Sequence, residues 1–154
     1  MTYIVWAGII ILTFFFEERI SIFHVAPNLT VALVYYMGIR KGEFEGLLLG
    51  SVIGTIEDSL SGAFLGPNLF SKGMVGYFSS FMFGSFFRWT PLLGAISIGL
   101  LTAVANTIAF ATRSFFDHMP TSMKAATCII IIQSFINVPI GLFLSPKNMQ
   151  KIGS

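Results

Sequence analysis

The sequence predicts an all-α integral membrane protein built as a bundle of about six transmembrane helices. Two observations lead to this fold class. Of the 154 residues, 55% are apolar and only 10% are charged, whereas soluble domains carry roughly 25% charged residues. The apolar residues also form long runs, and short segments containing Pro, Gly and charged residues separate them. We therefore expect one polytopic membrane domain over residues 1–154.

Three helices are expected in the first part of the chain. The apolar run Tyr3–Phe16 has 14 residues and would be about 21 Å long as a helix, less than an apolar core of about 30 Å. This helix must extend past Glu17-Glu18-Arg19 or lie in a locally thinned bilayer. Pro27 and Asn28 precede a second apolar run, Leu29–Ile39. We expect a helix to begin there, because Pro is tolerated in a first helical turn. The third helix is expected over 42–60.

Three further helices are expected after the turn at 61–67. They cover Asn68–Phe87, Pro91–Thr112 and Met123–Leu144. The segment 113–121 is the longest polar connection in the second half of the chain, and Pro146 follows the last run. The connections are short, so helices that follow one another are expected to lie antiparallel.

A glycine ridge distinguishes the third expected helix. Gly42, Gly46, Gly50 and Gly54 recur every four residues, and this spacing places them along one face of a helix. Glycine in a helix interior costs roughly 0.5–1 kcal/mol relative to alanine. The ridge therefore predicts a close contact with the backbone of another helix, in the bundle or in a partner.

Basic residues predict the orientation in the membrane. Arg40, Lys41, Arg88, Lys147 and Lys151 fall on the side of the N-terminus, and Arg19, Arg113 and Lys124 fall on the other side with most of the acids. Short loops rich in Lys and Arg stay in the cytoplasm. We expect a multi-pass protein of the bacterial inner membrane with both termini cytoplasmic.

Charged residues within apolar segments are candidates for function. Glu57 and Asp58 end the third expected helix, and Asn68 and Lys72 begin the fourth on the same side of the membrane. Adjacent helical positions point about 100° apart, so the two acids cannot readily share one substrate. We expect a polar, partner-facing cluster in which one acid faces the lipid headgroups and the other caps the following turn or pairs with Lys72, and Asp58 and Lys72 are expected to lie near enough to pair. Ion handling and catalysis are the alternatives.

Three amide side chains fall in the middle of expected spans. They are Asn106, Gln133 and Asn137, the last two at helical spacing. Such groups usually form hydrogen bonds between helices. A pocket for a polar ligand is the alternative.

Several function classes lack support in the sequence. Cys128 is the single cysteine, so no internal disulfide or zinc spacing is present. The net charge of +2 comes without a basic run, and this argues against nucleic acid as a partner. His24 and His118 lie in separate loops without a metalloprotease, hydrolase or phosphate-loop motif. We expect no catalytic residue, metal or cofactor.

The segment 27–77 resembles the MreD family of bacterial rod shape-determining membrane proteins. The matching features are Pro27-Asn28, the Gly-spaced helix with Gly54 and Asp58, and then Gly66, Asn68, Lys72 and Gly76-Tyr77. Two positions depart from the family pattern: Asn28 stands where Asp is frequent, and Glu57 stands where a neutral amide is common. The resemblance is specific over about a third of the chain.

The resemblance implies a non-enzymatic subunit of the cell-elongation machinery that helps to position peptidoglycan synthesis. The implied partners are the scaffold MreC, the RodA glycosyltransferase with its class B penicillin-binding protein, MreB and the lipid bilayer. The family is also similar in fold to the substrate-capture subunits of energy-coupling-factor transporters, and this supplies the alternative function. Such subunits have a small-residue docking ridge on the first helix, whereas the run Tyr3–Phe16 is bulky.

Overall fold

A computed structural model describes residues 2–19, 27–62, 65–84, 90–116 and 122–143. These residues form helices and no strand, as the sequence predicts. The helices are α1 Thr2–Arg19, α2 Leu29–Lys41, α3 Glu43–Leu60, α4 Pro67–Gly84, α5 Pro91–Phe116 and α6 Met123–Phe143. Helix α1 continues through the acids and ends at Arg19 in the described part of the chain, and residues 20–26, where a longer helix would continue, lie outside the described residues. His24, Arg88, His118, Lys147 and Lys151 lie outside the described residues.

Short polar side chains begin several of these helices. The Asn28 side chain accepts a hydrogen bond from the backbone N–H of Val31 at 3.2 Å and caps α2. Thr90 accepts one from the backbone N–H of Leu93 at 3.2 Å at the start of α5. Such caps satisfy N–H groups that have no partner inside the helix. A Pro or a small polar residue accordingly stands at the start of α2, α4, α5 and α6, whereas α3 follows Gly42 without a side-chain cap.

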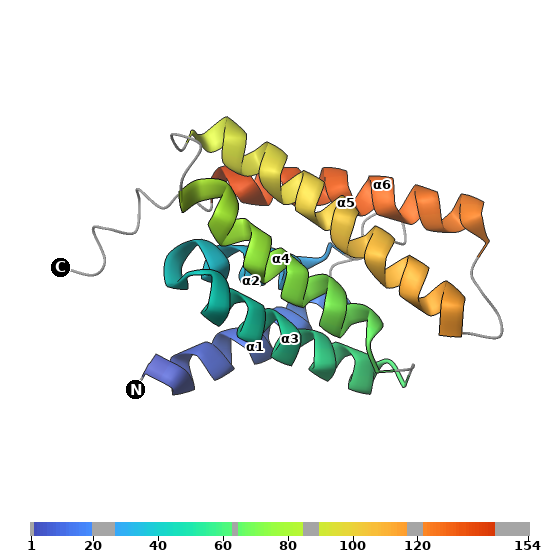
Figure 1. Cartoon of the computed structure of the whole chain (residues 1–154), viewed down its shortest axis with the longest axis horizontal. Helices are drawn as coiled ribbons and strands as arrows, with labels where there is room; N and C mark the ends of the chain where they lie inside the picture. Colours follow the sequence, from blue (N-terminus) through green and yellow to red (C-terminus); the bar gives the residue numbers. More distant parts are fainter. Residues whose placement is uncertain (1, 20–26, 63–64, 85–89, 117–121, 144–154) are drawn as a thin grey trace.

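Successive helices run in opposite directions and form one bundle (Figure 1). Helix α2 lies in the interior and contacts all the other helices. Its residues Val31, Val34 and Tyr35 are fully buried, and Ile98 and Ala105 of α5 pack into the same core. The two hairpins α3–α4 and α5–α6 are the most extensive helix pairs. One end of the bundle therefore combines the C-terminal ends of α1, α3 and α5 with the N-terminal ends of α2, α4 and α6.

The backbones of α3 and α4 touch along a row of glycines. A Cβ atom on Gly46 would lie 2.5 Å from Gly76 O, one on Gly50 would lie 2.2 Å from Lys72 O, and one on Gly54 would lie 2.3 Å from Asn68 O. Real Cβ atoms do not come this close to backbone atoms. Three glycines of the predicted ridge thus contact α4 within the bundle.

Gly42 does not belong to this row, and its assignment to the ridge was wrong. It lies between α2 and α3 with φ of 101°, and nothing lies within 4 Å of the position of its Cβ. A positive φ is costly for any residue except glycine. Gly42 is therefore the single residue that separates α2 from α3. The basic residues Arg40 and Lys41 before it are typical of a helix C-terminus.

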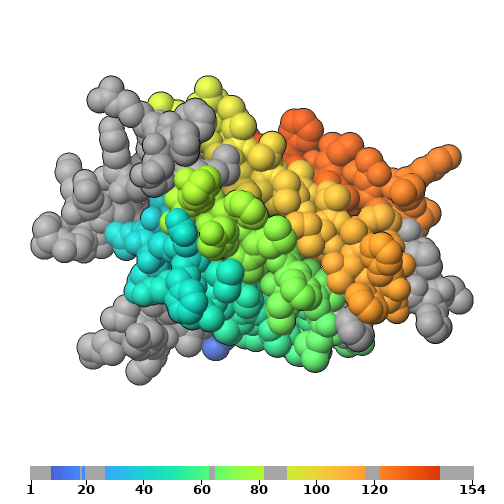
Figure 2. Space-filling view, viewed as in Figure 1, coloured from blue at the N-terminus to red at the C-terminus, as the bar shows by residue number. Residues whose placement is uncertain are grey.

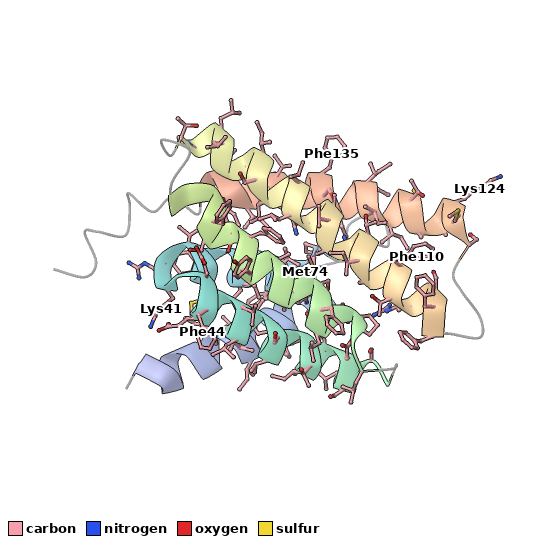
Figure 3. All side chains as sticks on the ribbon, in the orientation of Figure 1. Lys41, Phe44, Met74, Phe110, Lys124 and Phe135 are labelled. Atoms are coloured by element: carbon pink, nitrogen blue, oxygen red, sulfur yellow. The ribbon has the colours of Figure 1, made fainter. Side chains whose placement is uncertain are left out.

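The outer surface of the bundle is largely apolar. Phe44 and Phe135 are 72% and 73% exposed, and many other large apolar side chains are exposed around the bundle. Figure 2 shows the face formed by α3, α4 and α5. Lys41 and Lys124 lie at opposite ends of the bundle, and Phe135 points away from it (Figure 3). A surface of this kind suits a lipid environment.

Two of the described helices are long and apolar enough to cross a membrane by length and composition alone. They are Pro91–Phe116 and Met123–Leu142. Helix α2 has 13 residues, about 20 Å at 1.5 Å per residue. Helices α3 and α4 are less hydrophobic than α5 and α6, because α3 carries four acids and α4 contains Asn68, Lys72 and several Gly and Ser residues.

Candidate functional site

Charged and polar side chains gather at the end of the bundle where α2, α4 and α6 begin. Lys72 is their centre, with only 1% of its surface exposed. Its ammonium group donates hydrogen bonds to Glu57 Oε1 and to Thr30 Oγ1. The Thr30 hydroxyl can in turn donate to Glu57 Oε1 or to Asn28 Oδ1. A charge this deeply buried is stable only if it is paired and hydrogen-bonded, and these contacts provide both.

The partner of Lys72 is thus Glu57, and the predicted pairing with Asp58 was wrong. Asp58 is fully buried, and its carboxylate accepts hydrogen bonds from three backbone N–H groups. The donors are Gly66 at 2.9 Å and Asn68 and Leu69 at 3.1 Å each. The carboxylate therefore caps α4, where the positive end of the helix dipole also favours it.

The two adjacent acids have separate roles because they point in different directions. Asp58 follows Gly54 by four residues and continues the row of glycines, whereas Glu57 lies about 100° to one side of Asp58. Glu57 points toward α2 and Lys72, and Asp58 points toward the turn before α4.

Amide side chains connect α2, α5 and α6. Asn28 Nδ2 donates to Asn106 Oδ1 at 3.3 Å, and Asn106 Nδ2 donates to Gln133 Oε1 at 2.7 Å. Asn137 is fully buried, and its Nδ2 donates to the backbone oxygen of Asn28 and to Thr102 Oγ1, both at 3.0 Å. The three predicted amides thus form bonds between helices. Through Thr30 and Asn28 they join the Lys72 cluster in one network.

A pocket of about 540 Å³ opens beside this network. Its polar lining comes from all six helices or their ends: Glu17, Asn28, Glu57, Ser61, Asn68, Asn106, Arg113, Ser114 and Gln133. Its apolar lining comes mainly from α1, α5 and α6: Phe14, Leu60, Ala109, Phe110, Ala126, Ile129 and Ile130. A volume of this size is typical of pockets for small molecules.

The pocket brings together residues that the sequence placed apart. Asn106 and Gln133 line it with Glu57 and Asn68, whereas Asn137 and Lys72 lie behind its wall. Sequence reasoning did not single out Thr30 or the pocket-lining Glu17 and Arg113. Asn28 was noted at the start of the second expected helix and in the family resemblance, but not as a site residue. The position of Asn28 and Thr30 in the first turn of α2, after Pro27, is the one local signal that points to them.

Metal binding is not indicated in the part of the chain that the structure describes. No group of three His, Cys, Asp or Glu side chains there could hold a metal ion. Cys128 is exposed near the start of α6 and is a free thiol.

The fold and the site together define a class: a helical membrane protein whose few charges are matched inside the bundle and whose polar pocket lies at one end. Comparison with protein families then gives a specific result. A family model described as rod shape-determining protein MreD matches residues 1–143. The chain belongs to the MreD family, and membership supports a role in determining rod shape. Searches of curated proteins and of solved structures returned no match.

Proposed function

We propose that this protein is a non-enzymatic, multi-pass component of the bacterial inner membrane that binds an MreC-like scaffold and helps to position peptidoglycan synthesis. The observation that carries the proposal is the family match over residues 1–143. RodA, its class B penicillin-binding partner and MreB are the further partners expected of such a component. MreC binding is the specific claim to test.

The arrangement of charges supports six membrane spans. Hydropathy alone selects α5 and α6. In α3 and α4, however, Asp58 and Lys72 are buried and Glu57 is only 16% exposed by side chain, while outward residues such as Leu48, Val52 and Phe70 are apolar. Charges matched inside the bundle do not meet lipid, so they are compatible with a span.

A rigid bundle supports a role in positioning partners better than a role that requires the helices to move. The α3–α4 backbones are in contact along three glycines, and the hydrogen-bond network ties α2 to α3, α4, α5 and α6. A preorganised surface loses little conformational entropy when a partner binds. We expect the partner to dock on the apolar flank of the bundle or on its outer end.

Site-specific photo-crosslinking in cells tests the proposal. Crosslinkers are placed, one per variant, at exposed positions on different helices: Phe15, Phe44, Met74, Ile96 and Phe135. The proposal expects crosslinks to the MreC-like protein from neighbouring positions only. Membrane yield of each variant is the control. Full yield with no crosslink to that protein from any position would refute MreC binding.

The pocket favours a second candidate, a substrate-capture subunit of an energy-coupling-factor-type transporter. Against it, α1 presents large exposed side chains such as Ile11, Leu12 and Phe15 rather than a small-residue ridge. Co-purification separates the two candidates, since a capture subunit brings down ATPase subunits and an elongation component brings down the MreC-like protein.

A further inference from the structure

The Glu17 side chain lines the pocket, and one of its carboxylate oxygens accepts no hydrogen bond from the described residues. Its Oε2 atom is buried and has no hydrogen-bond partner among the residues that the structure describes. Lys72 is near enough to attract the Glu17 carboxylate, but two of the three N–H donors of its ammonium group are directed to Glu57 and Thr30, and it makes no hydrogen bond to this oxygen. A buried charged oxygen without a donor is costly, so a donor from a ligand would be strongly favoured there.

Arg113 supplies the opposite charge in the same pocket. It is exposed, and among the described residues it makes no ion pair. It lies near enough to Lys72 to repel that ammonium. An anionic group beside Arg113 would relieve this repulsion and could accept two parallel hydrogen bonds from the guanidinium group.

Among the described residues at this site, the acids and bases are equal in number. Glu17 and Glu57 are the acids, and Lys72 and Arg113 are the bases. A purely cationic or purely anionic ligand would bring a net charge into a site of reduced dielectric, which is unfavourable. A zwitterion would satisfy both Glu17 and Arg113 without changing the total.

We infer that this pocket binds a small zwitterion, with a primary ammonium group at Glu17 and a phosphate or carboxylate at Arg113. The apolar wall of Phe14, Phe110 and Ile129 would contact the carbon chain of the ligand. Two sources share this chemistry: the ethanolamine phosphate headgroup of a membrane lipid, and a free zwitterion such as glycerophosphoethanolamine, whose phosphodiester carries a single negative charge. The inference goes beyond partner binding and does not depend on it.

Lipid and ligand competition on the full-length protein tests the inference. The purified protein is exchanged into nanodiscs of phosphatidylcholine containing either phosphatidylethanolamine or phosphatidylglycerol, and lipids that remain bound are counted by native mass spectrometry. Phosphatidylcholine is the reference because its quaternary ammonium cannot donate a hydrogen bond. Free glycerophosphoethanolamine is added separately, and the shift in melting temperature is measured.

Charge-removing variants locate the site. Glu17→Gln and Arg113→Gln should each weaken binding about tenfold or more, the effect of losing one charge-assisted contact. Glu45→Gln and Lys124→Gln remove the same charges from exposed positions outside the pocket and should bind normally. Ser114→Phe fills the pocket from an exposed position and should block binding while leaving the fold intact.

The outcomes separate the two sources from failure. Selective retention of phosphatidylethanolamine, lost in Glu17→Gln, supports a lipid headgroup. A melting shift with free glycerophosphoethanolamine alone, lost in the same variant, supports a free zwitterion. Binding no stronger than that of phosphatidylcholine, or equal losses in the pocket variants and their matched controls, would overturn the inference.

Discussion

Gly46 and Gly76 face each other so closely that neither can carry a side chain. A Cβ atom on Gly76 would lie 2.0 Å from Gly46 O, and one on Gly46 would lie 2.5 Å from Gly76 O. Gly76→Ala should therefore destabilise the bundle by about 1–3 kcal/mol through overpacking. Gly8→Ala in α1, where nothing lies within 4 Å, is the matched control and should be neutral or slightly stabilising. Equal melting temperatures for both variants would contradict the contact.

The ion pair between Lys72 and Glu57 predicts a non-additive pair of variants. Glu57→Gln or Lys72→Met alone leaves a buried charge without its partner and should cost about 3–5 kcal/mol. The double variant removes both charges, so its loss should be clearly smaller than the sum of the single losses. Thermal unfolding of the detergent-solubilised protein gives all three values. Additive losses would show that Lys72 and Glu57 do not pair. The same conclusion would follow if combining Lys72→Met with Asp58→Asn recovered as much stability as combining it with Glu57→Gln.

The cap that Asp58 forms on α4 predicts a graded loss of stability. Asp58→Ala leaves three backbone N–H groups without their acceptor, and each buried group that stays unsatisfied costs about 1–3 kcal/mol. Asp58→Asn keeps one acceptor oxygen and should lose less. Hydrogen exchange at Gly66 and Leu69 should accelerate in both variants. The neighbouring exposed Ser59→Ala is the control, and an equal effect there would argue against a cap.

The proposed orientation predicts opposite labelling at the two ends of the bundle. In a Cys128→Ser background, Ser61→Cys at the pocket end should react with a membrane-impermeant thiol reagent added to intact spheroplasts. Lys41→Cys at the other end should react only after lysis. Both positions are exposed, so access depends on the membrane side. The reverse pattern would invert the topology.

Helix positions could be predicted from the sequence because apolar runs, Pro and Gly act locally. The boundaries of α2 follow from Pro27 and Gly42, and the glycine spacing indicates the close approach of α3 and α4. The spacing alone did not show that Gly42 lies outside the ridge, because a glycine that breaks a helix and one that packs inside a helix have the same spacing in one sequence. The two basic residues Arg40 and Lys41 are the signal that distinguishes them, since they mark the end of α2.

The site was only partly predictable, because its contacts join residues far apart in the chain. Asp58, Asn68 and Lys72 are close by covalent connection, but the choice between Glu57 and Asp58 depends on the rotation of α3. Thr30 meets Glu57 across 27 residues, and Asn28 meets Asn106 across 78. No periodicity in a single sequence encodes such pairs.

The cap of Asp58 on α4 also bears on how the chain enters the bilayer during synthesis. Its carboxylate is matched only when the turn at Gly66 has formed, since its three donors lie within eleven residues after it. A lone α3 would bring this charge unmatched into hydrocarbon, which is costly. Insertion of α3 and α4 together as a hairpin avoids that cost. Force measurements on nascent chains with an arrest peptide should then show one pulling event for the pair, and two separate events would exclude joint insertion.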